Sequence, residues 1–221
     1  MSFGANPLQN PSEHRKCRYH PKVITRQTVD STKFNTGLTL PHNLRVLDFE
    51  AAMQDVYDFF FDVNTHLVEK SLPRLEDMLR AANLSGTLSD MITESLAKHS
   101  RSLAVNSYPN GHPDLVVSGV YANNSVKSGE QGVEIKTTRK KGGAVDTHGA
   151  RDQCFCVFVY QVYTDTQPSS SRAAMRFTEV YCGDVTVDDF RRNERGELGT
   201  RTATLDRDGI AKLRKSWVYL D

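Results

Sequence analysis

The stretch HPDLVVSGVYANNSVKSGEQGVEIKTT, residues 112–138, decides the fold that we expect for the whole chain. Residues 114–121 are rich in apolar and β-branched side chains, which predicts a strand. Residues 123–129 are rich in Asn, Ser and Gly, which supply turn conformations. Residues 133–138 then alternate between apolar and polar side chains, as is typical of a second strand. We therefore expect two strands joined by a polar loop, an arrangement that can pair as a hairpin.

Three ionisable residues of such a hairpin would meet at one end of a sheet. Asp114 opens the first strand, and Glu134 and Lys136 point to one face of the second because side chains alternate across a strand. Two adjacent carboxylates repel each other unless one of them takes up a proton or a cation binds between them. Carboxylate oxygens and water suit Mg²⁺, which lowers the pKa of a bound water and stabilises charge on a phosphate. The chemistry indicated is hydrolysis of a phosphodiester, with the Lys ammonium stabilising the same developing charge.

The same residues carry a resemblance to a known family. Pro113-Asp114, followed after a strand-sized gap by Glu134-Ile135-Lys136, resembles the PD-(D/E)xK motif of the restriction-endonuclease-like nucleases. The resemblance covers residues 112–138 and extends over about residues 85–165, whereas residues 1–45 show no resemblance. The resemblance implies an α/β fold in which helices flank a central mixed β-sheet (α/β/α).

The activity that the resemblance implies is that of a type II restriction endonuclease, which cuts double-stranded DNA at a specific sequence and depends on Mg²⁺. In such an enzyme Asp114 and Glu134 are catalytic and bind the metal, and the backbone carbonyl of Ile135 is a third ligand. Lys136 positions or activates the attacking water. The resemblance also implies a homodimer and a cognate DNA methyltransferase in the cell.

Two further residues are candidates for an enlarged site. In proteins that resemble this family, a helix before the first catalytic strand can donate an extra acid, and Glu94 is the candidate here. A surface Glu within a helix explains the same residue. His112 is a candidate for contact with the scissile phosphate, and its alternative is a loop histidine with a structural hydrogen bond.

Two basic segments are candidates for DNA contact. Three consecutive cations and two glycines follow the second strand, a composition that suits a loop gripping phosphates but also an exposed hairpin tip. A later segment combines Arg with Asn, which often read guanine and adenine in the major groove, although a solvated basic helix end has the same composition. The candidate DNA-binding residues are Arg139, Lys140, Lys141, His148, Arg151, Arg191, Arg192 and Asn193.

The chain of 221 residues is long enough for one domain with a buried core. It contains no apolar run long enough to span a membrane, and its first residues lack the apolar segment of a secretory signal, so we expect a cytoplasmic protein and no membrane partner. Its four cysteines do not form a disulfide framework at this length. The half zinc spacing at Cys17 and His20 has no second pair at a suitable distance.

Charge is distributed unevenly, although the formal net charge is only +1. Residues 1–46 hold seven Lys or Arg against two acids, and residues 47–80 hold three against eight acids. We expect residues 1–45 to form an irregular basic arm with a short strand at 22–28. The arm either embraces DNA or a second subunit, or it wraps the domain as a solvated tail. The phosphate contacts of a DNA-embracing arm are expected from Arg15, Lys16 and Arg18.

Residues 46–221 are expected to form a single nuclease domain that begins with helices in residues 46–105. Apolar residues at steps of three and four predict helices at 47–69, at 73–82 and from 87 or 89 to 102. Asp48 is the expected N-cap of the first helix, which serves either the core or a dimer interface. Gly86 is expected to end the second helix.

A catalytic sheet is expected within residues 112–185, followed by C-terminal helices in 186–221. The near-continuous apolar run at 154–163 predicts a central strand covered on both faces. A further strand is expected at 175–185. Thr186 and Asp189 resemble a capping box that opens a short helix carrying Arg191, Arg192 and Arg195. Leu213 and Trp217 are expected to dock a last helix, after a short strand at 202–205.

Two other functions use the same residues differently. A repair or mobile-element nuclease has the same site but prefers flaps, nicks or mismatches to an intact recognition sequence. A non-catalytic DNA-binding domain carries the Glu-x-Lys triplet by coincidence and shifts DNA without cutting it. The intact Asp, Glu and Lys argue against a degenerate, binding-only relative.

Overall fold

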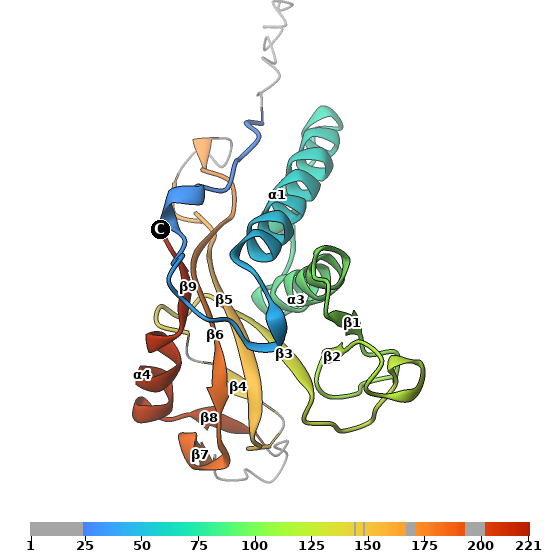
Figure 1. The fold of residues 1–221 in the computed structure, drawn as a ribbon. Coiled ribbons are helices and arrows are strands. Elements are labelled where there is room, and N and C mark those ends of the chain that lie inside the picture. Colours follow the sequence, from blue (N-terminus) through green and yellow to red (C-terminus); the bar gives the residue numbers. More distant parts are fainter. Residues whose placement is uncertain (1–23, 144, 148, 167–170, 193–201) are drawn as a thin grey trace, which may run out of the picture.

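A central mixed β-sheet organises the molecule. The computed structural model describes residues 24–143, 145–147, 149–166, 171–192 and 202–221. The sheet has six strands in the spatial order β1, β2, β3, β5, β6, β9 (Figure 1). Only the β3–β5 pair is parallel among these neighbours. The strands are β1 (Leu103–Val105), β2 (Leu115–Val117), β3 (Gly132–Thr138), β5 (Gln153–Gln161), β6 (Arg176–Val185) and β9 (Trp217–Leu220).

Helices α1 (Val46–Glu69) and α3 (Ala81–His99) cover one face of this sheet (Figure 1). The apolar side of α3 consists of Leu84, Leu88, Ile92 and Leu96, which recur every four residues and are fully buried. They share one core cluster with residues of β3, β5 and β6. The short α2 (Leu75–Met78) lies between the two long helices in the chain.

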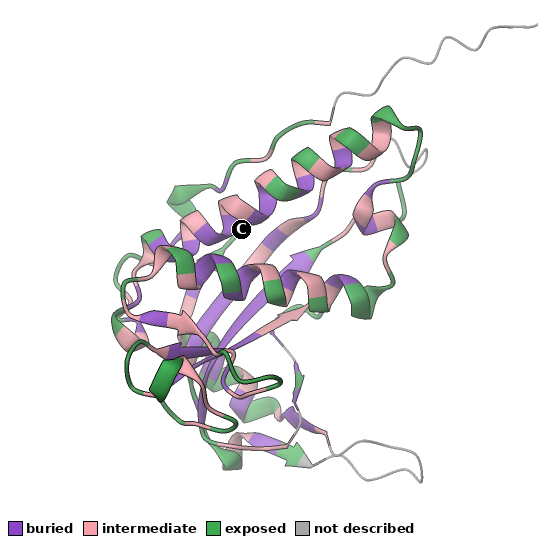
Figure 2. Cartoon of the chain, turned by 90° about the vertical axis from the view of Figure 1, so that its right-hand side faces the viewer, coloured by how far each residue is buried: buried purple, intermediate pink, exposed green. Residues whose placement is uncertain are grey.

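The other face of the sheet carries a second core. Helix α4 (Arg207–Lys215) and a small antiparallel sheet of β4 (Asp146–Thr147), β8 (Ala203–Leu205) and β7 (Phe190–Arg192) pack there. Strand β5 alternates between the two cores, with Cys154, Cys156 and Phe158 under α1 and α3 and with Phe155 and Val157 on the opposite side. Figure 2 shows the strands largely buried between exposed outer surfaces. The prediction of a central strand covered on both faces is therefore confirmed, and the fold is mixed α/β with helices against a mixed sheet.

The predicted pairing of the two motif strands is also confirmed. β2 pairs antiparallel with β3, with Leu115 opposite Val133 and Val116 opposite Gly132. The first strand ends at Val117, however, and Val120 is half-exposed in a turn, so its predicted extension to residue 121 is wrong. Gly119 has a φ of 79°, which turns the chain out of the strand.

The helix boundaries in residues 73–102 differ from the prediction. A single helix, α3, runs from Ala81 to His99, and Gly86 lies inside it rather than ending the one before. Gly86 faces open space, and the buried side of α3 continues past it, so tertiary packing outweighs the low helix propensity of glycine. The predicted helix at 73–82 is reduced to the four residues of α2.

The start of α1 is shifted from the expected N-cap. Arg45 is the N-cap residue, and Asp48 lies at the third helical position, where its carboxylate accepts from the Arg45 backbone N at 2.8 Å. Asp48 is 1% exposed. Leu47 and Phe59 belong to the apolar pattern that predicted this helix, but they are 65% and 40% exposed.

The C-terminal part contains one α-helix and short strands rather than the expected helices. Thr186 and Asp189 form the predicted capping box, but it encloses a single 3-10 turn that leads into strand β7. Arg191 and Arg192 therefore lie on a strand, and Asn193 and Arg195 lie outside the described residues. Asp206 caps α4 through hydrogen bonds from two backbone N–H groups, and Trp217 belongs to β9.

Residues 24–45, the described part of the basic arm, lie against the domain. They contain two 3-10 turns and no strand at 24–28. Val29, Phe34, Leu40 and Leu44 are buried in the core cluster under α1, and Phe34 forms an isolated bridge with Tyr219 of β9. Residues 1–23, which include Arg15, Lys16, Arg18, Cys17 and His20, lie outside the described residues. In the part of the chain that is described, no helix is long and apolar enough to cross a membrane.

Candidate active site

The Asp114 carboxylate is held at the open edge of β3. β2 pairs with β3 only as far as Val133, so the later residues of β3 have no backbone partner from β2. Asp114 fills this place, because its Oδ2 accepts a hydrogen bond from the Ile135 backbone N at 2.7 Å. The sequence motif thus becomes a direct contact between its two halves.

Glu134 is buried in the middle of the cluster, with 1% of its surface exposed. Its Oε1 accepts from Lys136 Nζ at 2.6 Å, which confirms that the two side chains share a face. Its Oε2 lies 3.2 Å from His112 Nδ1. His112 therefore makes the side-chain hydrogen bond that its structural alternative expected, and its partner is the predicted catalytic Glu.

The pKa values of the two carboxyl groups shift in opposite directions. Burial raises the pKa of Asp114 to about 6, and the neighbouring Glu134 charge adds to the rise. Burial also acts to raise the pKa of Glu134, but the adjacent Lys136 ammonium and His112 outweigh it and lower that pKa. Of the two acids, Asp114 is therefore the one whose charged form burial and repulsion disfavour.

The donor set fits a Mg²⁺ ion. In the described residues no group of three or more His, Cys, Asp or Glu side chains is arranged to hold a metal, so protein carboxylates would supply no more than two ligands. Mg²⁺ is commonly held by one or two carboxylates and keeps several waters. The Ile135 carbonyl, the predicted third ligand, accepts from Ser89 Oγ at 3.2 Å, and a hydroxyl donor can rotate away. Burial and the neighbouring Glu134 raise the pKa of Asp114, and a bound cation would oppose both effects.

An acidic cleft of about 300 Å³ lies on the Asp114 side of the cluster. Glu94 lines it from α3 together with Asp114, so the structure brings the predicted additional acid to the same cleft. Asp90, one helical turn before Glu94, lines it as well and was missed from the sequence. The signal for Asp90 was its four-residue spacing from Glu94, which places both on one side of a helix.

A second cleft, of about 460 Å³, lies on the Lys136 side and carries basic residues. Lys136, Arg139 and Lys140 line it. The Arg139 guanidinium lies over the ring of Tyr160, with 5.6 Å between its carbon and the ring centroid. Glu179 anchors the loop that follows, because its Oε2 accepts from the Gly142 backbone N at 2.8 Å. Lys141 is exposed in this anchored loop.

The remaining DNA-binding candidates are not all assembled in that cleft. Arg191 lines a different groove, beside α4, together with Arg207 and Arg214, which were missed from the sequence. Arg151 is half-buried in the segment before β5. His148, Asn193 and the side chain of Arg192 lie outside the described residues.

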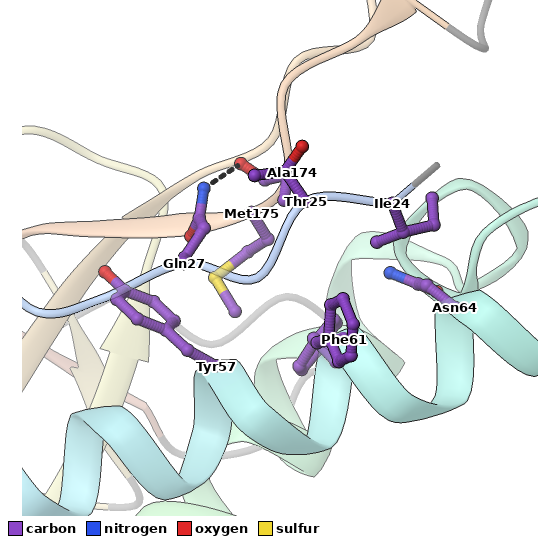
Figure 3. Close-up of a pocket in the computed structure, with 9 residues that line it drawn as sticks. Ile24, Thr25, Gln27, Tyr57, Phe61, Asn64, Ala174 and Met175 are labelled. Atoms are coloured by element: carbon purple, nitrogen blue, oxygen red, sulfur yellow. Dashed lines mark hydrogen bonds between the residues drawn. The ribbon is translucent and has the colours of Figure 1, made fainter. Parts of the chain in front are cut away.

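Figure 3 shows a further cavity, at the seam between α1, residues 24–27 and residues 174–175. Its lining is mostly apolar, with Phe61 and Met175 among the contributors, and Gln27 Nε2 reaches across to the Ala174 carbonyl at 3.5 Å. The cavity holds only about 10 Å³, room for a single water. It is a packing defect rather than a ligand site.

Comparisons of the chain with protein-family models, with curated proteins and with solved structures found no match. The functional argument therefore rests on the residues of the β2–β3 hairpin and on their geometry.

Proposed function

We propose that this protein is a Mg²⁺-dependent, sequence-specific endonuclease that hydrolyses phosphodiester bonds of double-stranded DNA. The observation that carries the proposal is the convergence of Asp114, Glu134 and Lys136 around the Ile135 peptide, with contacts of 2.7 and 2.6 Å. We further propose that the mixed sheet is a restriction-endonuclease-like sheet. Its support is the hairpin that carries both halves of the motif and the parallel β5 that follows.

Each residue of the cluster has a role that its contacts support. Asp114 and Glu134 would hold the metal, which supplies positive charge to a phosphate oxygen and a lowered pKa to a bound water. Lys136 has two ammonium hydrogens left after its bond to Glu134, and these orient the attacking water or the phosphate. His112 holds the second oxygen of Glu134 and so fixes the plane of that carboxylate.

The reaction proposed is a direct hydrolysis. The oxygen of water bonds to phosphorus and loses a proton to solvent, and the bond from phosphorus to the 3′ oxygen breaks. The 3′ oxygen takes up a proton from solvent, so the products carry 5′-phosphate and 3′-hydroxyl ends. The basic cleft of Lys136, Arg139 and Lys140 is the part of the site suited to the DNA backbone, because phosphates are bound mainly by Lys and Arg. A homodimer and a protecting DNA methyltransferase complete the proposal.

The experiment is incubation of the purified protein with plasmid and phage DNA, in Mg²⁺ and in EDTA, beside the Asp114→Asn variant. Discrete fragments that need both Mg²⁺ and Asp114 are expected, and their ends give the recognition sequence and the stagger. A non-specific smear retains the site but moves the function to repair or degradation. DNA that stays intact with every divalent ion, together with a band shift, leaves only a binding domain and overturns the proposal.

A further inference from the structure

Gln153, the first residue of β5, is buried, but its side-chain amide makes no hydrogen bond. It is 5% exposed, and neither its amide nitrogen nor its amide oxygen has a hydrogen-bond partner. Buried polar atoms in folded proteins are almost always paired, since an unpaired one carries a full desolvation penalty. The other buried atoms without hydrogen-bond partners belong to Arg74, Glu76 and Arg176. Arg74 and Arg176 make ion pairs through another nitrogen of the same side chain, and Glu76 Oε1 lies 3.6 Å from Arg74 Nε. Among the described residues, Gln153 alone has its whole polar group unmatched.

The register of the sheet places Gln153 on the same face as the candidate site. Phe155 and Val157 belong to the core on the α4 side of the sheet, and side chains alternate, so Gln153 points to that face too. Glu134 pairs with Phe155 and Lys136 with Val157 in the parallel β3–β5 ladder, and paired residues share a face. Gln153 is therefore a diagonal neighbour of Glu134.

The strand positions around Gln153 offer it no polar partner. Continuing the β3–β5 register by one residue puts Gly132 beside it, which has no side chain. On its other side it pairs with Val185 of β6, which is apolar. Both oxygens of Glu134 are already engaged by Lys136 and His112. The amide thus stands next to the cluster with its donor and its acceptor both unused.

We propose that Gln153 is a substrate-binding residue of this site, an inference that rests on the proposed nuclease function. Its Nε2 donates to a phosphate oxygen of the DNA strand where that strand passes Glu134, and its Oε1 accepts from a water held beside that phosphate. The amide has no hydrogen-bond partner in the free protein and gains one when the substrate binds. This explains why an apolar residue does not occupy this position. Functional sites commonly retain such a loss of stability.

The experiment compares Gln153→Met, Gln153→Glu and the wild type in two measurements. Thermal unfolding without DNA tests the unpaired amide, and Gln153→Met is expected to raise Tm by about 2–4 °C because it fills the space without a polar group. Titration of a duplex carrying the mapped recognition sequence, in Ca²⁺ to prevent cleavage, tests the contact. We expect binding about tenfold weaker for Gln153→Met. Gln153→Glu, which adds negative charge facing a phosphate, is expected to bind more weakly still.

The control is Gln161→Met, the same substitution at the exposed end of the same strand, which is expected to change neither measurement. Unchanged DNA binding by both Gln153 variants, with wild-type cleavage, overturns the inference alone. A lower Tm for Gln153→Met with unchanged binding also overturns it, since the amide is then satisfied inside the protein by a buried water. If Gln153→Met does not fold, binding by Gln153→Glu decides. A wild-type protein that neither cuts nor binds DNA overturns the proposed function itself, and this inference with it.

Discussion

Two clusters of buried charge occupy different parts of this fold, and they are built differently. The hairpin cluster joins β2 and β3, and the α2 cluster joins α1, α2 and the segment before β6. The hairpin cluster consists of His112, Asp114, Glu134 and Lys136. The α2 cluster consists of Asn64, Arg74, Glu76, Asp77 and Arg172.

The α2 cluster contains two acids and two arginines, and its hydrogen bonds are made to other groups of the protein. Arg172 Nη1 contacts Asp77 Oδ1 at 2.7 Å, and Asn64 Nδ2 donates to Glu76 Oε2 at 2.8 Å. Arg74 Nη1 donates to the Arg172 carbonyl at 2.9 Å and so ties α2 to the strand side of the molecule. Arg74 Nη2 and Glu76 Oε1 have no hydrogen-bond partner, but both side chains are paired through other atoms. The cluster holds together segments that are far apart in the sequence.

The hairpin cluster leaves its charge out of balance. Asp114 has its pKa raised to about 6 by burial and by the neighbouring Glu134. The hairpin cluster also lies beside two clefts, one lined by Asp114 and the other by Lys136. Buried charge is common to both clusters, so the proposed site assignment rests on unbalanced charge next to open space. The difference predicts that substitutions in the hairpin cluster lower the cleavage rate, whereas substitutions in the α2 cluster lower the free energy of unfolding.

The largest effect is expected from the hairpin cluster in cleavage assays. Asp114→Asn, Glu134→Gln and Lys136→Met should each lower the single-turnover cleavage rate on the order of 10³-fold, because each removes charge aimed at the reacting phosphate. Rates are compared per folded molecule, because Glu134→Gln and Lys136→Met each break the buried Glu134–Lys136 ion pair and are expected to lower Tm as well. Glu130→Gln and Lys127→Met, exposed on the loop before β3, are the matched controls and should cut normally. Wild-type cleavage by any of the first three variants contradicts the site assignment.

The next effect is expected from the α2 cluster in stability. Glu76→Ala leaves Arg74 buried beside a lost charge, and breaking a buried ion pair from one side costs about 3–5 kcal/mol of unfolding free energy. Urea denaturation should show this loss as a lower midpoint. Cleavage per folded molecule should not change. If Glu76→Ala were as stable as the wild type but did not cleave DNA, Glu76 would take part in the reaction, and the two clusters would not differ in role.

The pH dependence of stability sharpens the comparison through Asp114. Because the pKa of Asp114 in the folded protein, about 6, lies above its unfolded value, the folded state keeps a proton that the unfolded state loses. Its contribution therefore falls as pH rises from about 4 to about 6. Relative to Asp114→Asn, the wild type should lose about 2–3 kcal/mol over this window and no more above it.

Mg²⁺ provides the control for this prediction. If Asp114 binds the ion, Mg²⁺ should raise the stability of the wild type above pH 6 and leave Asp114→Asn unchanged. Denaturation curves at several pH values, with and without Mg²⁺, measure both effects. A pH profile shared by the wild type and the variant would remove the argument for an uncompensated carboxyl.

The sequence predicted the hairpin cluster but not the α2 cluster, and the reason is physical. The residues of the hairpin lie on two paired strands, where alternation and register follow from local pattern, so Asp114 and Glu134 could be placed together in advance. The α2 cluster joins residues about a hundred positions apart, such as Arg74 and Arg172, and no local period encodes such a contact.

The same reasoning explains the errors of element type. Gly86 looked like a helix end because its propensity is low, but the apolar face of α3 decided the outcome. The capping box at Thr186 was recognised, yet the three residues after it pair with β8 and become a strand. The sequence did not single out Gln153, which precedes the predicted strand at 154–163, since only the three-dimensional structure shows which polar atoms lack partners.

The smallest effect on stability is expected from a partly exposed cluster of polar side chains around Asp55. Asp55 on α1 accepts hydrogen bonds from Ser95, Lys98 and His99 of α3, at 2.5 to 2.9 Å, but its side chain is 35% exposed. Burial acts to raise the pKa of Asp55, and these three partners outweigh it and hold the pKa at about 2. Asp55→Asn should therefore lose only about 1 kcal/mol of stability, because solvent screens the interaction.

The sign of the pH effect is opposite to that of Asp114. A folded pKa below the unfolded value gives stability that is present above about pH 4 and is lost as pH falls toward 2. The difference in unfolding free energy between the wild type and Asp55→Asn should be constant at neutral pH and should disappear in acid. A difference that instead grew as pH fell would mean that the folded protein favours the protonated form of Asp55. The opposite signs expected for Asp55 and Asp114 would then be wrong.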